Sequence, residues 1–549
     1  MIRFFPLLLA MSLAAADLPS GYLKLMNDGA SEVKRRLAAE PAATLETLEA
    51  VPGWRHFPST VLVAAVLYQK QHDRDMLTLA ERIGDVILDA DSRGVYAKRL
   101  DHHRDTYMWL DAYRILERDL DPARRDRWRK ALMEHMAPLA AEVARRRDYP
   151  WYQSPFIGTS PNHYALWAST LYLGGKVFGN PEWESLAGNV MHRLAVEQAP
   201  DGYWGEHSSA GPTTNYDYLT SAGVALYYEH SKDPDALAAI RRSIDFHKHF
   251  IYPDGHGVET VDDRNRQGGV SMWGSFGFSH SAEGRRLAEF LLSRYPAGRL
   301  SPESLGRMAQ NALYFHEGPT APIPLDRPAF HYQMSVPAGI RKSGPWFVCL
   351  SGILATQTPR NQYFLDRQSH ISIFHEKAGL IVTGAQAKRQ PELATFTEKL
   401  SDQVAHMPMS SRLQMGEFED SLALAYNSFF AVVRGTIGDA VELKTEITPK
   451  GRIAEAAFNL QLRLYPGETL ETGSGKTVTL GEEAIDIPTE GSLRHHGWVM
   501  KTDPAARIKW PVYPFNPYAN GPEKALAQAV GVLSVPVRAG TIALTVSVP

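Results

Sequence analysis

The sequence lacks the features that mark disulfide-bonded, highly charged or membrane-spanning proteins. Cys349 is the only cysteine among 549 residues, so no disulfide can form within the chain. The formal net charge is −3, and lysine and arginine are spread along the chain. This argues against a nucleic-acid or membrane-surface partner, which would require a strongly basic face. Beyond the N-terminus, no stretch is long and apolar enough to span a bilayer.

The N-terminus, "MIRFFPLLLAMSLAAADLPS", has one arginine, an apolar core over residues 4–13 and then three alanines. This layout is typical of a secretory signal peptide that is cleaved after a small residue. We therefore predict a signal peptide over residues 1–16 and an exported protein, either periplasmic or secreted. The alternative is a buried N-terminal helix.

Residues 17–320 have a helical pattern. Apolar positions recur every three or four residues in segments such as "STVLVAAVLYQKQ" and "HYALWASTLYLGGKVFG". The segments come in pairs joined by short turns, which favours a toroid of helical hairpins. A superhelical repeat array would show a fixed sequence period, and none is present.

The pattern changes across the proline-rich stretch "EGPTAPIPLDRPAF". Residues 321–549 contain short alternating or β-branched segments, such as "HISIFHEKAGLIVTGA" and "TIALTVSV", which predict an antiparallel β-sandwich. The predicted fold class is therefore α+β multidomain, with an N-terminal (α/α) toroid of helical hairpins followed by a C-terminal antiparallel β-sandwich domain. A cleft between the two halves is a common place for a ligand site.

Three polar loops of the helical half carry the candidate site. They read "DYPWYQSPFIGTSPNHYALW", "DGYWGEHSSAGPTTNYDYLT" and "YPDGHGVETVDDRNRQGGVSMWGSFGFSH". In a toroid such loops would line one end of the central cavity, and their aromatic rings suit stacking on sugars. The residues we predict to bind a sugar substrate are Trp151, Tyr152, Trp204, Tyr218, Arg264 and Trp273.

The polar residues of these loops suit β-elimination on a uronic-acid polymer. The C5 proton of a uronate is very weakly acidic, so its removal requires Asn, His or Arg to neutralise the neighbouring carboxylate. A base must take that proton and an acid must protonate the glycosidic oxygen at C4, and tyrosine can do either. The predicted partner is an acidic polysaccharide, cleaved to 4,5-unsaturated uronides without a cofactor.

"DGYWGEH", with a tyrosine nine positions after the histidine, resembles the catalytic segment of the hyaluronate, chondroitin and xanthan lyases of polysaccharide lyase family 8. The resemblance implies an (α/α) toroid followed by antiparallel β-sheets. It assigns the family's catalytic His and Tyr to His207 and Tyr216, and its Arg to Arg266. We assign the family's Asn to Asn162, and Tyr218 stays open as the alternative acid or base.

The pair Asn162–His163 is more similar to the Asn-His pair of the toroid alginate lyases of family 17 and of heparinase II/III-like lyases. In those families a His and a Tyr share the acid and base work, and a residue of the β-domain enters the site. The predicted catalytic residues are Asn162, His163, His207, Tyr216 and Arg266.

Simpler structural roles and other functions stay open at this point. Asn162 could cap a helix. Arg264 and Arg266 could form surface ion pairs with the neighbouring aspartates. A toroid glycoside hydrolase acting on uronides would need two carboxylates. A uronyl C5-epimerase or a non-catalytic glycan-binding protein would use overlapping residues. The hydrolase candidates are Glu206, Asp217, Glu259 and Asp262.

A structural zinc or calcium ion in the β-domain stays open, because some heparinase II-like lyases carry a zinc there. His370 and His375 are the candidates. Residues five apart on a strand point to opposite faces, so the pair would clamp a metal poorly unless a bulge intervened. The oligomeric state is not predicted.

Overall fold

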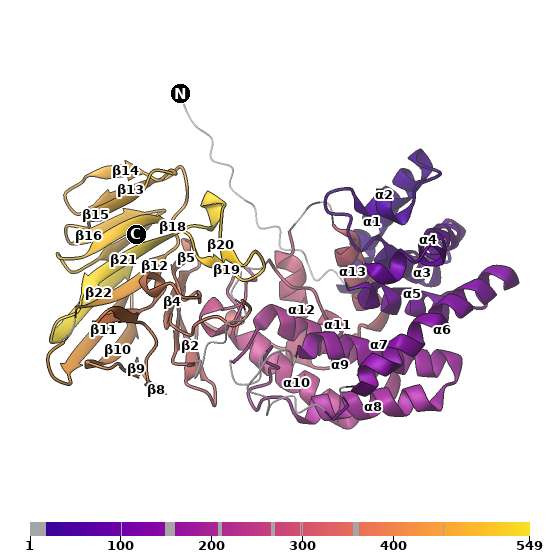
Figure 1. The fold of residues 1–549 in the computed structure, drawn as a ribbon, viewed down its shortest axis with the longest axis horizontal. Helices are drawn as coiled ribbons and strands as arrows, with labels where there is room; N and C mark the ends of the chain where they lie inside the picture. The colour runs from indigo at the N-terminus through magenta and orange to yellow at the C-terminus, as the bar shows by residue number, and fades with distance from the viewer. Residues whose placement is uncertain are drawn as a thin grey trace.

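The computed structural model describes residues 18–99, 101–145, 147–148, 160–206, 211–264, 269–296, 298, 300–354, 362–453 and 455–549. The predicted signal peptide lies outside these ranges and stays a prediction. The chain forms a helical half followed by a half made of β-sheets, which lie side by side in Figure 1. The predicted fold class is confirmed.

The helices of the N-terminal half form hairpins. The bounds are α1 (Leu18–Ala39), α2 (Leu45–Glu49), α3 (Thr60–Gln71), α4 (Arg74–Ser92), α5 (His102–Leu116), α6 (Pro122–Arg145), α7 (Pro161–Phe178), α8 (Pro181–Val196), α9 (Thr214–Ser231), α10 (Pro234–His249), α11 (Ser275–Phe278), α12 (Ala282–Arg294) and α13 (Pro302–Tyr314). Among the described residues, no helix is long and apolar enough to cross a membrane.

The turn between α7 and α8 shows how the sequence sets these hairpins. Gly179 ends α7 with φ +69°, a conformation that glycine adopts without strain. The Asn180 side chain accepts hydrogen bonds from the backbone N–H groups of Glu182 and Trp183, at 3.1 and 3.2 Å. Pro181 then occupies the first helical position, where no backbone donor is needed.

The helices divide into an inner and an outer set by burial. On α3, every residue from Thr60 to Leu67 is buried, and α7 and α9 are buried on nearly all sides. On α4 and α10, by contrast, apolar residues form one buried stripe. The inner helices approach closely, because a Cβ atom on Gly223 of α9 would lie 2.6 Å from the Cβ of Ala165 on α7.

The C-terminal half is built from two antiparallel sheets. The first has the order β1-β2-β3-β4-β5-β12-β21-β18-β15, with β6 paired to β12 and β7 to β6. Its strands are β1 (Ala329–Gln333), β2 (Ala338–Ser343), β3 (Trp346–Ser351), β4 (Ile371–His375), β5 (Gly379–Thr383), β6 (Phe396–Leu400), β7 (Gln403–Ala405), β12 (Ala456–Leu462), β15 (Ile485–Pro488), β18 (Arg507–Val512) and β21 (Val530–Pro536).

The second sheet has the order β14-β13-β16-β17-β22-β11-β10-β9-β8. Its strands are β8 (Ser410–Met415), β9 (Glu419–Ala425), β10 (Phe429–Ile437), β11 (Ala440–Pro449), β13 (Thr469–Thr472), β14 (Thr477–Thr479), β16 (Ser492–His495), β17 (Trp498–Lys501) and β22 (Gly540–Ser547). Side chains of both sheets, such as Ile373 and Leu424, share one apolar core, as in a sandwich.

A shared core joins the two halves. Tyr252, from the helical half, stacks on Phe374 of β4 with ring centroids 4.7 Å apart, and its hydroxyl lies 2.8 Å from the Ser372 hydroxyl. Cys349 is buried in the same cluster, on β3, as predicted. The small hairpin of β19 (Phe515–Asn516) and β20 (Gly521–Pro522) reaches from the sheets toward the helices (Figure 1).

Candidate functional site

The first turns of the inner helices lie together at one end of the toroid. Near the starts of α5 and α7, the Nδ1 atom of His163 lies 3.9 Å from Asp101 Oδ1. On the same two helices the rings of His103 and Trp167 are 5.4 Å apart. Gly223 of α9 packs on Ala165 of α7, and further along both helices the ring of Tyr227 lies 4.9 Å from that of Tyr172, so the two helices run in the same direction and Tyr216, in the first turn of α9, lies at this end too. The starts of α5, α7 and α9 therefore lie at the same end of the toroid.

Tyr216 contacts a residue of the β-sheet half. Its hydroxyl lies 2.7 Å from the hydroxyl of Tyr518, which sits at the tip of the hairpin of β19 and β20. The ring of Tyr363, also from the β-sheet half, lies 6.1 Å from that of Tyr518. Aromatic side chains from the second half thus border the first turn of α9.

A buried ion pair lies beside Tyr216. Arg264 Nη2 is 3.5 Å from Glu206 Oε1, and the guanidinium carbon lies 5.9 Å from the centre of the Tyr216 ring. Burial raises the pKa of Glu206 while Arg264 lowers it, and the hydroxyl of Ser160 hydrogen-bonds to the same carboxylate. Because Ser160 immediately precedes α7, this pair ties three polar loops together.

The protonation of Tyr216 depends on opposing influences. Burial raises the pKa of its phenol, the hydrogen bond with Tyr518 lowers it, and the charge of Glu206 raises it. The cations Arg264 and Arg104 lower it. The net effect is a raised pKa, so Tyr216 carries its proton at neutral pH and can act as an acid.

Asn162 is a buried polar residue in the first turn of α7. Its side chain is 1% exposed, and its Oδ1 atom has no hydrogen-bond partner among the described residues. The capping alternative for Asn162 is wrong, because Ser160 occupies the N-cap position. A buried amide oxygen of this kind is open to a hydrogen bond from a ligand or a water molecule.

Two of the predicted sugar-binding residues are core residues. Trp204 is 1% exposed, and its indole N–H donates to the Leu194 carbonyl oxygen at 2.8 Å. Tyr218 is 3% exposed and stacks on His247 with ring centroids 3.7 Å apart. Neither ring has a free face for a sugar, so we withdraw both as sugar-binding residues. Tyr218 lies two residues after Tyr216 on α9, so its side chain leaves the helix on a different side and packs in the core of the toroid.

Trp273 also lacks an open face. The guanidinium carbon of Arg307 lies 3.9 Å from the centre of its ring, and that of Arg104 lies 5.7 Å away. Both arginines pair with Glu303, at 2.9 and 3.1 Å. Trp273 therefore helps to fix Arg104 near Tyr216, and we withdraw it as a sugar platform. Trp151, Tyr152, His207 and Arg266 lie outside the described residues.

The sequence did not single out Tyr518, Tyr363 or Arg104 for this site. Tyr518 lies in the turn "NPYANGPE", where an aromatic residue among Asn, Pro and Gly is the only local signal. No sequence pattern pairs it with Tyr216, 302 positions away.

A polar cavity of about 350 Å³ lies between the two halves, beside the start of α9. Thr214 and Asn215 of α9 line it on one side, and Arg463 and Tyr465 of the β-sheet half on the other. Its lining includes the acidic residue Glu259, whose Oε1 accepts the backbone N–H of Gly384 at 2.9 Å.

Glu259 predicts a pH-dependent stability. Burial raises its pKa to about 7, although the Gly384 N–H opposes the shift. Between the unfolded-state pKa of about 4.3 and this value, the folded protein binds more protons than the unfolded chain. The free energy of unfolding therefore decreases as pH rises through this interval, by about 4 kcal/mol from this residue.

Urea unfolding at about pH 5 and about pH 8 measures this effect. Glu259→Gln keeps an oxygen acceptor for Gly384 but cannot ionise, so its stability should fall less over that interval. The same pH dependence in both proteins would contradict the assignment to Glu259.

The histidines proposed for a metal in the β-sheet half have separate partners. The Nδ1 atom of His370 lies 2.7 Å from the Ser351 carbonyl oxygen, and burial lowers the His370 pKa to about 4. His375, at the end of β4, packs on Trp346 and accepts the Lys377 N–H at 3.1 Å. The pairing of β4 with β5 does shift register between Ile373 and Phe374, which lie between the two histidines. Each imidazole ring nevertheless has separate neighbours, Ser351 for His370 and Trp346 and Lys377 for His375.

Comparisons with known proteins identify the fold. No protein-family model and no curated protein sequence matches the chain. The structure resembles a chondroitin AC lyase of Streptomyces coelicolor A3 in complex with chondroitin sulphate. The TM-score is 0.55 and the identity 13%, over 100% of this chain and 80% of that chain.

A point variant of the same lyase matches with a TM-score of 0.51 and 14% identity, over the same shares of both chains. An unsaturated glucuronyl hydrolase specific for heparin matches 54% of this chain and 97% of its own, with 12% identity. Its TM-score of 0.38 is too low to carry an argument. The chain thus has the toroid-plus-sandwich fold of the chondroitin AC lyase.

Proposed function

We propose that the protein is a polysaccharide lyase that cleaves a uronic-acid-containing polysaccharide by β-elimination. The observation that carries the proposal is the position of Tyr216. A proton-bearing phenol is held at the end of the toroid between a cation, Arg264, and a residue of the β-sheet half, Tyr518. The fold shared with a chondroitin AC lyase supports it.

In the proposed reaction, Tyr216 is the acid and His207 the base. His207 takes the C5 proton, the electron pair of the C5–H bond forms the C4–C5 double bond, and the C4–O bond breaks. Tyr216 gives its proton to the departing glycosidic oxygen, which fits the raised pKa of its phenol. Tyr518 positions the Tyr216 hydroxyl.

The uronate carboxylate needs positive or hydrogen-bonding groups as charge develops on it. Asn162, whose buried amide has an unpartnered oxygen, is proposed to contact this carboxylate together with Arg266. A flip of the amide would present its N–H₂ group instead of the oxygen. Arg264, paired with Glu206, supplies a fixed positive charge beside Tyr216.

The substrate is proposed to be a modestly charged uronan. The net charge of −3 gives no reason to expect a strongly basic groove of the kind that highly sulfated chains favour. Chondroitin is the first candidate, because the structural neighbour was solved with chondroitin sulphate. Export to the periplasm or medium, proposed from the N-terminal sequence, would bring the enzyme to such polymers.

The hydrolase alternative requires two carboxylates at the site. Three of the four candidates instead accept backbone hydrogen bonds. Asp217 accepts the N–H of Trp204, Glu259 that of Gly384, and Asp262 that of Thr214. Asp217 also pairs with the buried His247 at 2.8 Å. These contacts give the three carboxylates structural roles, which favours the lyase.

The proposal is tested by incubating the protein with hyaluronan, chondroitin, heparin, alginate, glucuronan and ulvan. A lyase forms a double bond conjugated to the uronate carboxylate, which absorbs in the ultraviolet. We expect this absorbance to grow with at least one modestly charged polymer. Cleavage of a polymer without such absorbance would instead support a hydrolase.

A further inference from the structure

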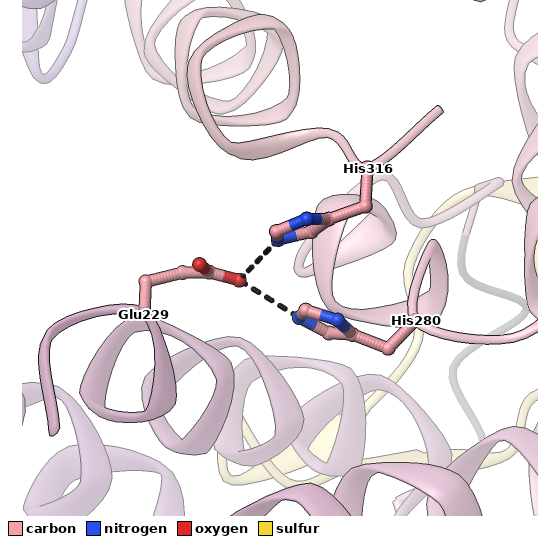
Figure 2. Close-up of side chains that lie close together, drawn as sticks. All are labelled: Glu229, His280 and His316. Atoms are coloured by element: carbon pink, nitrogen blue, oxygen red, sulfur yellow. Dashed lines mark hydrogen bonds and ion pairs between the residues drawn. The ribbon is translucent and has the colours of Figure 1, made fainter. Parts of the chain in front are cut away.

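Two histidines meet one carboxylate at a distance from the candidate catalytic site. Figure 2 shows His280 and His316 with their Nε2 atoms pointing to the same oxygen of Glu229. The distances to Glu229 Oε1 are 2.8 Å from His280 and 2.9 Å from His316. The two imidazole rings lie 4.1 Å apart and are tilted by 38°.

We propose that Glu229, His280 and His316 form a binding site for a divalent transition-metal ion of the zinc type. All three ligand atoms lie within 4.8 Å of one another. Two imidazole nitrogens and one carboxylate oxygen are a common zinc ligand set that leaves a fourth position for water. Imidazole ligands favour such ions over magnesium or calcium, which prefer oxygen.

The geometry needs only a small adjustment to hold the ion. With bonds of about 2.0–2.1 Å, tetrahedral ligand atoms are roughly 3.3 Å apart. The observed separations from Glu229 are about half an ångström shorter, so small side-chain rotations would suffice. The side chain of His316 is 43% exposed, which gives an ion and a water molecule access, whereas that of Glu229 is 7% exposed.

The Glu229 carboxylate is oriented toward the two histidines. Its Oε1 atom is the one that both histidines approach. Lys232 Nζ lies 2.9 Å from the other carboxylate oxygen, Oε2, and holds Glu229 so that Oε1 faces the histidines. The lysine charge should also weaken binding of a cation.

The three residues come from separate segments of the helical half. Glu229 lies near the end of α9, His280 between α11 and α12, and His316 two residues after α13, where the chain leaves the helical half. An ion would tie these segments together. Tyr216 is thirteen residues before Glu229 on the same helix, about 20 Å along its axis, so the ion would take no part in the elimination.

A second group, His192 with Asp233 and Asp235, provides a control. His192 and Asp235 are exposed, and Asp233 already caps α10 by accepting the Asp235 N–H at 2.9 Å. These contacts explain the group without a metal. His192→Ala therefore removes a histidine beside two carboxylates without touching the proposed site.

The test is isothermal titration of the chelator-treated full-length protein with Zn²⁺. We expect one tight site, weakened at least tenfold in His316→Ala and in His280→Ala and unchanged in His192→Ala. Circular dichroism checks the fold, and the exposure of His316 makes its variant the safer one. Absence of a tight site, or unchanged affinity in both variants, would overturn the proposal.

A spectroscopic variant locates the ion directly. Loaded with Co²⁺, the protein should show the visible absorption of a tetrahedral ion. His316→Cys should add a sulfur-to-metal charge-transfer band in the near ultraviolet, because a thiolate would join the ligand set. If Co²⁺ binds but His316→Cys shows no such band, the ion lies elsewhere and the proposal fails.

Discussion

Tyr216→Phe is expected to lower the rate of uronan elimination by a factor of about a hundred to ten thousand. The variant keeps the ring but loses the proton that we assign to the departing glycosidic oxygen. It also loses one hydrogen bond, to Tyr518, at a cost of about 1 kcal/mol, so the fold should survive. The measurement is kcat on the polymer identified by the absorbance assay.

Tyr218→Phe is the matched control, since it removes the same atom two residues away. Tyr218 is 3% exposed and stacks on His247, so its hydroxyl is not expected to reach a substrate. We expect activity within a few-fold of the unchanged protein. Loss of activity in Tyr218→Phe with full activity in Tyr216→Phe would reverse the assignment.

Trp204→Ala is expected to destabilise the protein by about 3–5 kcal/mol. The indole is 1% exposed, and its N–H donates to the Leu194 carbonyl, so the change leaves both a cavity and an unpaired acceptor. The Trp204 backbone N–H donates to Asp217 on α9 at 2.6 Å, which links the loop before His207 to the helix that bears Tyr216. Urea unfolding measures the loss.

Phe418→Ala is the control for removal of a large aromatic side chain. Phe418 is 77% exposed, so its truncation should change the free energy of unfolding by less than about 0.5 kcal/mol. If Trp204→Ala were no more destabilising than Phe418→Ala, the core position given to Trp204 would be wrong. Such a result would reopen its role at the sugar site.

The fold could be predicted because its signals are local. The helical period, turns such as Gly179–Asn180–Pro181 and the alternating strands all act over a few residues. The last helix ends at Tyr314 and the first strand begins at Ala329, on either side of the predicted change at residue 320. Local patterns cannot specify how strands far apart in the chain pair, as β12 does with β5 and β21.

The site could be predicted only in part, for the same reason. The segment that carries Tyr216 could be found from its polar residues. The neighbours of Tyr216, Tyr518 and Arg104, come from segments that only the tertiary fold brings near. Residue type also misled the prediction at Trp204 and Trp273, since aromatic residues serve a core and a sugar site equally well. Burial, which distinguishes these roles, depends on the packing of the whole toroid.

Cleavage in water enriched in oxygen-18 tests the central claim most directly. β-Elimination breaks the C4–O bond and adds no water, so mass spectrometry should find no heavy oxygen fixed in the products at early times. The new non-reducing end should also be lighter than a hydrolysis product by one water molecule. Products that carry one heavy oxygen at the new reducing end and a saturated non-reducing end would show hydrolysis and contradict the account.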